Sequence, residues 1–145
     1  MSGPTRPTAG AAAGPVVCRE GGGSEWERAV GAATAVAAGP LVLVGGTLPP
    51  AAGAAALGDP YEQTRSALAD AVAALEPFGL GAADVVRTRL YLAHARDGED
   101  ASRAHRELFG EIRPVCTVLV VGFPDSRVLV QVELEAFRGG EGGGA

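Results

Sequence analysis

The stretch that most constrains the fold is residues 128–136, with the sequence VLVQVELEA. Apolar and polar positions alternate along it, which is typical of a strand with one face on a hydrophobic core. The polar positions are Gln131, Glu133 and Glu135. Carboxylates within an apolar strand need a cationic partner or water, because a lone buried carboxylate is costly. We therefore expect the rest of the chain to place these carboxylates in a cleft.

The remaining segments alternate between strands and amphipathic helices. Strands are predicted at residues 33–37, 41–44, 85–92 and 115–121, and helices at about 59–76 and 98–109. The first helix opens with an Asp cap, then Pro, and Glu three residues after the cap, which is a typical helix start. This order predicts an α+β fold with one sheet and two helices on one of its faces. The other face would mix arginines, acids and aliphatic residues, which favours an oligomer that packs such faces together.

Glycine, alanine and proline gather near the ends of the chain. Residues 1–24 and 139–145 show no hydrophobic periodicity and are predicted to be disordered, which leaves one domain at 25–138. Trp26, the only tryptophan, is expected to anchor the start of this domain. No segment is apolar for long enough to span a bilayer, and the N-terminus lacks a signal-peptide pattern, so we expect a cytoplasmic protein.

Charge and composition disfavour several functions. The formal net charge of -5 argues against nucleic acids and anionic membranes as partners. The chain has no lysine, which excludes a lysine Schiff base and removes the usual P-loop lysine, and no cofactor is expected. The two histidines and two cysteines have neither metal-ligand spacing nor the pattern of a disulfide framework, so no metal site is expected.

Four segments, in order and spacing, resemble the RidA/YjgF family. They are residues 44–49 (VGGTLP), 62–64 (EQT), 84–88 (DVVRT) and 132–136 (VELEA), and the likeness covers about residues 26–138. The resemblance implies a chorismate-mutase-like fold and a homotrimer whose sheets line a central barrel, with ligand clefts between subunits. The best-understood members of the family hydrolyse reactive imines and enamines, releasing ammonia and a 2-oxo acid.

The resemblance also implies site residues. Glu133 corresponds to the family's water-positioning carboxylate, and Gly46 and Thr117 match further positions of the cleft. Cys116 is a candidate substrate contact. Strand alternation instead turns Cys116 toward the helices as a buried, inert thiol, and a nucleophilic role would require a base that the sequence does not place.

Two departures from the family pattern affect the expected substrate. Val115 replaces the arginine that clamps a substrate carboxylate, and Ala32 replaces the tyrosine of the first strand. Arg113 or Arg89 is a candidate replacement for the clamp, because a guanidinium binds a carboxylate in a bidentate geometry. Without the usual tyrosine and arginine, the pocket is expected to be more apolar and its substrate larger and less polar, such as an intermediate of specialised metabolism.

Two functions of different classes remain open. In the first, the chain is a RidA-like enzyme that acts on an imine, enamine or enol-type small molecule. In the second, it is a non-catalytic trimeric ligand-binding or interaction module, in which Glu133 and Glu135 only form ion pairs with Arg87 or Arg89. An RNA-cleaving role has been attached to the family, but the acidic net charge and the lack of a basic, aromatic surface disfavour it.

Overall fold

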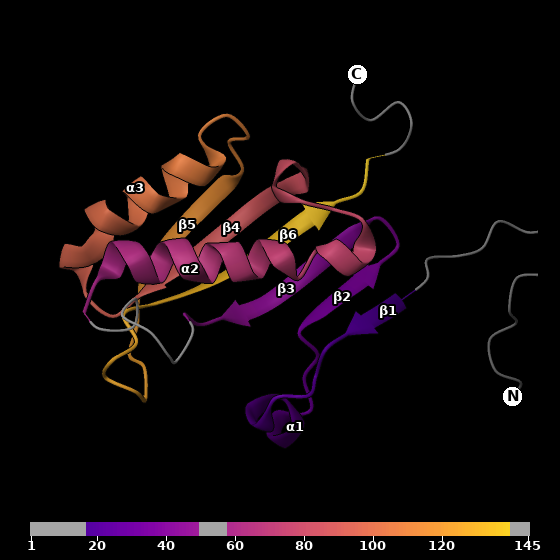
Figure 1. The fold of residues 1–145 in the computed structure, drawn as a ribbon, viewed down its shortest axis with the longest axis horizontal. Coiled ribbons are helices and arrows are strands. Elements are labelled where there is room, and N and C mark those ends of the chain that lie inside the picture. The colour runs from indigo at the N-terminus through magenta and orange to yellow at the C-terminus, as the bar shows by residue number, and fades with distance from the viewer. Residues whose placement is uncertain (1–16, 50–57, 140–145) are drawn as a thin grey trace, which may run out of the picture.

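A six-stranded mixed sheet forms the centre of the fold (Figure 1). The computed structural model describes residues 17–49 and 58–139. Its strands are β1 (Val17–Glu20), β2 (Ala35–Ala38), β3 (Leu41–Thr47), β4 (Val85–Leu92), β5 (Val115–Val120) and β6 (Val130–Phe137). They lie in the order β1-β2-β3-β6-β4-β5. The pair of β4 and β5 is parallel, and the other neighbours are antiparallel.

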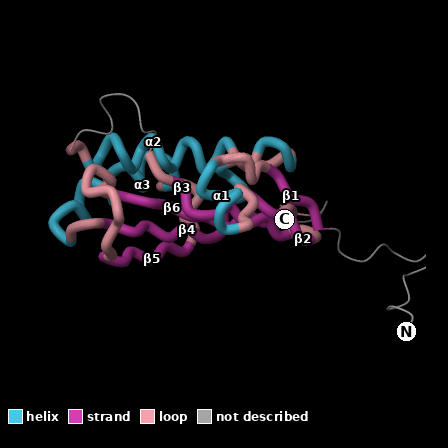
Figure 2. The backbone as a smooth tube through the Cα atoms, turned by 90° about the horizontal axis from the view of Figure 1, so that it is seen from below, coloured by secondary structure: helices cyan, strands magenta, loops and turns pink. Residues whose placement is uncertain are grey.

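Two long helices, α2 (Pro60–Ala73) and α3 (Gly98–Phe109), cover one face of the sheet (Figure 2). The carboxylate of Asp59 accepts a hydrogen bond from the backbone N–H of Glu62, so α2 begins as the sequence predicts. The shorter helices are α1 (Glu25–Val30) and 3-10 turns at Glu76–Phe78, Ala82–Asp84 and Ala95–Asp97. This arrangement confirms the predicted α+β layer. None of the helices in the described ranges has the length and apolar character needed to cross a membrane.

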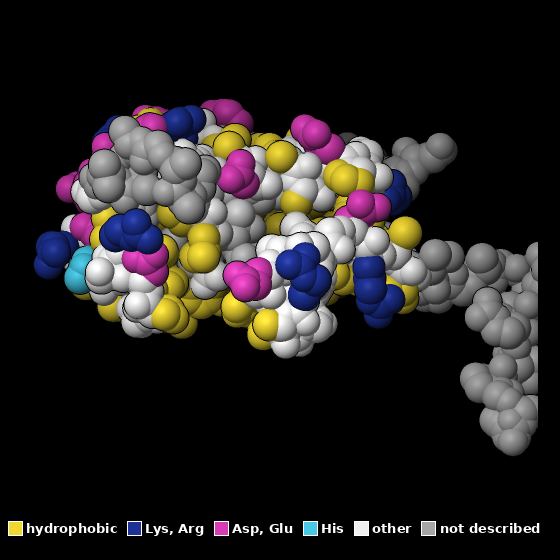
Figure 3. All heavy atoms as spheres, turned by 60° about the horizontal axis from the view of Figure 1, so that its bottom comes forward, with side chains coloured by type: hydrophobic (Ala, Val, Ile, Leu, Met, Phe, Trp, Pro, Cys, Tyr) yellow, Lys and Arg dark blue, Asp and Glu magenta, His cyan; other side chains and the backbone are white. Residues whose placement is uncertain are grey.

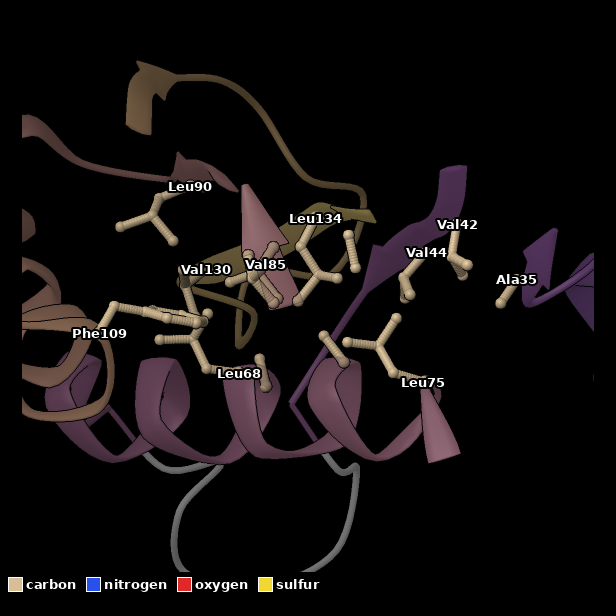
Figure 4. Close-up of a cluster of buried hydrophobic side chains, with 14 of the residues drawn as sticks. Ala35, Val42, Val44, Leu68, Leu75, Val85, Leu90, Phe109, Val130 and Leu134 are labelled. Carbon is tan, nitrogen blue, oxygen red and sulfur yellow. The ribbon is translucent and has the colours of Figure 1, made fainter. Parts of the chain in front are cut away.

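The hydrophobic core lies between α2 and the sheet. Leu68 of α2 and Leu75, which follows the helix, point toward Val85, Val130 and Leu134 of the strands (Figure 4). All five side chains are buried, and each contributes roughly 1.5–3 kcal/mol relative to an exposed position. The alternate apolar positions of β6 all belong to this core, which confirms the pattern predicted for the last strand.

One strand lies within the N-terminal segment that composition predicts to be disordered. Residues 17–20 form β1, which pairs antiparallel with β2 and places Val17 opposite Ala38. This strand lies exposed at the edge of the sheet and has no buried face, so its sequence needs no hydrophobic alternation. Residues 1–16 and 140–145 of the predicted tails, and residues 50–57 of the predicted loop, lie outside the described residues.

Two predicted placements, those of Cys116 and Trp26, are wrong, and an irregularity interrupts the alternation of β4. The register of β4 against β6 shifts between Val85 and Arg87, so Val85 is buried and Val86 is exposed, the reverse of simple alternation. Cys116 is exposed rather than buried, because β5 is the other edge strand and all of its residues are exposed. Trp26 is also exposed and does not anchor the core.

Candidate functional site

The face of the sheet without helices carries the predicted row of acids and arginines. Arg89 on β4 lies between Glu133 on β6 and Thr117 on β5, so these three residues form one row across the strands. One guanidinium nitrogen of Arg89 lies 3.3 Å from Glu133 and 3.5 Å from Glu135. A longer contact of 3.8 Å joins Arg87 to Glu135. The four charged side chains are partly exposed, so each pair contributes at most about 1 kcal/mol to stability.

Glu133 has a second partner, Tyr91, that the sequence analysis does not assign to the site. The hydroxyl of Tyr91 donates a hydrogen bond to the carboxylate oxygen of Glu133 that also faces Arg89. This hydrogen bond, followed by burial, raises the pKa of Tyr91 above its ordinary value of 10.0. Alternation places Tyr91 on the same face as Arg89, but the contact also depends on the register between β4 and β6, which the sequence alone does not give.

Tyr91 also lines a pocket of about 850 Å³, here called the Tyr91 pocket. The sheet contributes Tyr91, Gly46 and Gln131, α1 contributes Trp26 and Glu27, and the loop at residues 121–125 closes the other side. Figure 3 turns this lower edge of Figure 1 forward and shows hydrophobic side chains gathered along it. The pocket thus joins a largely apolar lining to the hydroxyl that contacts Glu133.

The side chain of Gln131 packs closely beside Gly46. A Cβ atom at residue 46 would lie 2.5 Å from the side-chain nitrogen of Gln131 and 2.9 Å from its amide carbon. The register of β3 against β6 also shifts between Val44 and Thr47, around this glycine. Gly46 therefore belongs to the pocket, and any side chain there would have to displace Gln131.

The predicted site residues do not meet at one place within a single chain. Glu133, Arg89 and Thr117 share a row, and Gly46 joins them through the Tyr91 pocket. Cys116 occupies the next position on β5 and faces the opposite side of the sheet from Thr117.

Arg113 lies apart from this group. It lines a separate hollow of about 270 Å³ at the C-terminal end of α3, together with His105 and Pro114. Arg113 lies two residues before the start of β5 and has a positive φ of 57°. The strand begins opposite Arg87, four residues before Tyr91, which is roughly 13 Å along the sheet. Arg113 therefore does not reach Glu133 or the Tyr91 pocket of its own chain.

The histidine of α3 has a structural contact. The Nε2 atom of His105 lies 2.7 Å from the hydroxyl of Thr88, which is fully buried on β4. Burial lowers the pKa of His105 below 6.5, which favours the neutral ring at neutral pH. In the described part of the chain, no three His, Cys, Asp or Glu side chains are grouped so as to hold a metal ion.

The tyrosine titration of the folded protein should report the contact between Tyr91 and Glu133. The Glu133→Gln change removes the carboxylate that holds the neutral phenol, so the pKa of Tyr91 should fall back toward 10.0 in an ultraviolet absorbance titration. The stabilisation by this contact is present below pH 10 and is lost as the pH rises through the raised pKa. In the control Glu107→Gln, the pKa of Tyr61 should fall instead, because the hydrogen bond from the Tyr61 hydroxyl to Glu107 raises the pKa of Tyr61. Identical titration curves for Glu133→Gln and Glu107→Gln would contradict the pairing of Tyr91 with Glu133.

Comparisons of the sequence identify its relatives. The sequence model of a family described as Endoribonuclease L-PSP matches residues 28–137. An uncharacterized protein of Streptomyces coelicolor is 56% identical over 121 residues, which cover 81% of this chain and 89% of that protein. A RutC family protein of Pyrococcus horikoshii is 30% identical over 106 residues, which cover 72% of this chain and 84% of that protein.

The fold has relatives among solved structures. One is the crystal structure of a Mycobacterium tuberculosis protein that is a member of the highly conserved YjgF/YER057c/UK114 family. It matches this chain with a TM-score of 0.75 and 37% sequence identity, over 84% of this chain and 99% of that one. With its mixed six-stranded sheet and two main helices, the chain therefore belongs to the YjgF/RidA family.

Proposed function

We propose that the protein is an enzyme that acts on a small imine, enamine or enol-type metabolite, with Glu133 orienting water or accepting a proton. One observation carries this proposal. The partly exposed carboxylate of Glu133 is held by Arg89 and by the hydroxyl of Tyr91, and Tyr91 lines a pocket large enough for a small molecule. A general base must be held within hydrogen-bond reach of the proton that it takes, directly or through one water.

For an imine, the proposed reaction is hydrolysis. Water adds to the carbon of the C=N bond while Glu133 accepts one of its protons and returns that proton to the nitrogen, which gives a carbinolamine. The hydroxyl proton of the carbinolamine then passes to the nitrogen, ammonia leaves, and a carbonyl compound remains. Tyr91 stays neutral because of its raised pKa, so its hydroxyl donates to Glu133 and holds the carboxylate beside a residue that lines the pocket. Neither step requires a cofactor.

The proposal includes a homotrimer in the cytoplasm, with the sheets around a central barrel. Support comes from β5, where the exposed apolar side chains are Val115, Val118, Leu119 and Val120. Such an edge strand normally packs against another chain. A cleft between subunits would also place further candidates at the site, with Thr117 or Cys116 of one copy beside the Tyr91 pocket of the next.

A non-catalytic trimeric ligand-binding module is the second candidate function. The ion pairs of the open face favour it, because Arg89 contacts both Glu133 and Glu135. The RNA cleavage suggested by the name of the family model has less support. A protein with a net charge of -5 repels the phosphate backbone that supplies most of the affinity for RNA.

Ammonia release tests the proposed chemistry. Imines are generated in the assay by an amino-acid oxidase, which gives 2-imino acids, and by an amine oxidase, which gives imines without a carboxylate. The protein should accelerate ammonia release from at least one of these imines, and light scattering should show that the same sample is assembled. If an assembled sample accelerates none of them, the hydrolase proposal fails and the binding module takes its place.

A further inference from the structure

We propose that the Tyr91 pocket selects a flat, ring-bearing molecule that is neutral or positively charged, and that Trp26 and Glu27 set this selectivity. The inference rests on the proposed function for the chemistry, and it concerns what the pocket binds. It points to aryl-substituted imines with a free C=N–H group that lack a carboxylate, rather than to 2-imino acids.

The charges of the pocket are the first reason. Among its described lining residues, the charged side chains are Glu27 and Asp125, and no arginine is among them. Asp125 is already neutralised by Arg127, whose guanidinium donates to the two carboxylate oxygens at 3.1 Å and 2.9 Å. These bonds and one from the Arg127 backbone lower the pKa of Asp125 from 3.8 to about 2. A bound molecule therefore finds Asp125 matched with a cation.

Glu27 is the unmatched charge of the pocket. Within the described ranges no ion pair joins it to an arginine. Its carboxylate accepts hydrogen bonds from the hydroxyl of Thr34, at 2.8 Å, and from the backbone N–H of Ser24, at 3.2 Å. The Thr34 hydroxyl and the Ser24 backbone lower the pKa of Glu27 below 4.5, so the group is ionised at neutral pH. A cationic ligand would supply the missing countercharge, whereas a carboxylate would meet like charge.

The aromatic rings of the pocket are the second reason. Trp26, Tyr91 and Phe123 line it, and Trp26 is 66% exposed. The capping box of Ser24 and Glu27 fixes the first turn of α1, so the indole is presented beside the pocket instead of in the core. An exposed tryptophan offers a face for stacking and for cation–π attraction, both of which suit a flat cation. The same helical turn thus carries both the ring and the unmatched carboxylate.

Three flat molecules of nearly the same shape test the selectivity. They are benzamidine, benzamide and benzoate, with charges of +1, 0 and -1. Binding to the full chain is measured by calorimetry and by the fluorescence of Trp26, which is the only tryptophan and therefore reports the pocket alone. Benzamidine should bind about tenfold or more tightly than benzoate and should change the fluorescence, with benzamide between them.

Two variants locate the effect. Glu27→Gln keeps a capping-box side chain but removes the charge, so it should abolish the preference for benzamidine over benzamide. Trp26→Leu should weaken the binding of all three compounds. Glu25→Gln is the matched control, because it removes an acid from the same helix outside the pocket lining, and it should leave the preference unchanged.

Several results would overturn this inference. They are binding of benzoate as tightly as benzamidine, no binding of any of the three compounds, and an unchanged preference in Glu27→Gln. If only the proposed function fails, benzamidine binds as expected but no imine is hydrolysed. If the protein hydrolyses 2-imino acids rapidly but does not bind benzamidine, the proposed enzymatic function stands and the proposed selectivity of the pocket is rejected.

Discussion

Replacing Phe109 with alanine should lower the free energy of unfolding by about 3–5 kcal/mol, the usual cost of truncating a buried aromatic side chain. Phe109 is fully buried at the end of α3, and its ring centroid lies 4.8 Å from that of His105. The void would also loosen the bond between His105 and Thr88, which joins α3 to β4. Chemical denaturation at one fixed protein concentration measures the loss, because assembly makes apparent stability depend on concentration.

Leu108→Ala is the matched control for this change. Leu108 precedes Phe109 on the same helix and is 37% exposed, so its truncation should cost less than about 1 kcal/mol. Equal losses in the two variants would contradict the packing of α3 against the sheet.

The largest effect on assembly should come from Leu119→Glu, which we expect to convert the proposed trimer to single chains. Leu119 lies on the open face of β5, opposite Tyr91, and is 40% exposed in the single chain. If this face packs against another copy, the new carboxylate would lose water without gaining a partner, at a cost of several kcal/mol. Light scattering measures the mass, and circular dichroism should show that the fold is retained.

Leu108→Glu controls for the introduction of a charge at an exposed leucine. Its position on α3 is exposed to a similar extent, 37%, but lies on the helical side of the molecule, so the mass should not change. A wild-type protein that is a single chain, or a Leu119→Glu variant that keeps the wild-type mass, would contradict the proposed assembly.

The elements that the sequence predicted correctly have local signals. The alternation in β6 defines its buried face, because side chains one residue apart point to opposite sides of a strand. The Asp cap and the proline that follows fix the start of α2. The ion pairs with Arg87 or Arg89 that one of the two open alternatives gives to Glu133 and Glu135 are present as three contacts on the open face.

The features that the sequence did not predict depend on pairing between distant segments. The contact of Tyr91 with Glu133 depends on strand register, and β1 is defined by its backbone pairing with β2. Cys116 is exposed because β5 lies at an edge, and neighbours across a sheet cannot be read from one strand. Hydrophobicity alone predicts that Trp26 is buried as an anchor of the domain, whereas α1 presents its exposed ring beside a pocket.

The central claim is that Glu133 is a catalytic carboxylate and not only a member of an ion-pair network. Glu135 is a close internal control, because both side chains are 28% exposed, lie on the same face of β6 and contact Arg89. They differ in that Glu133 accepts a hydrogen bond from the hydroxyl of Tyr91, a residue that lines the Tyr91 pocket. The two glutamates can therefore be compared by replacing each with glutamine.

The decisive measurement is kcat for hydrolysis of the best imine substrate by Glu133→Gln and by Glu135→Gln, with the mass of each variant checked by light scattering. We predict that Glu133→Gln loses about 100-fold or more of kcat while its mass stays that of the wild type, as expected for removal of a general base. Glu135→Gln should retain most of the activity. Equal losses in the two variants, full activity in Glu133→Gln, or loss of assembly in Glu133→Gln would contradict a catalytic role for Glu133.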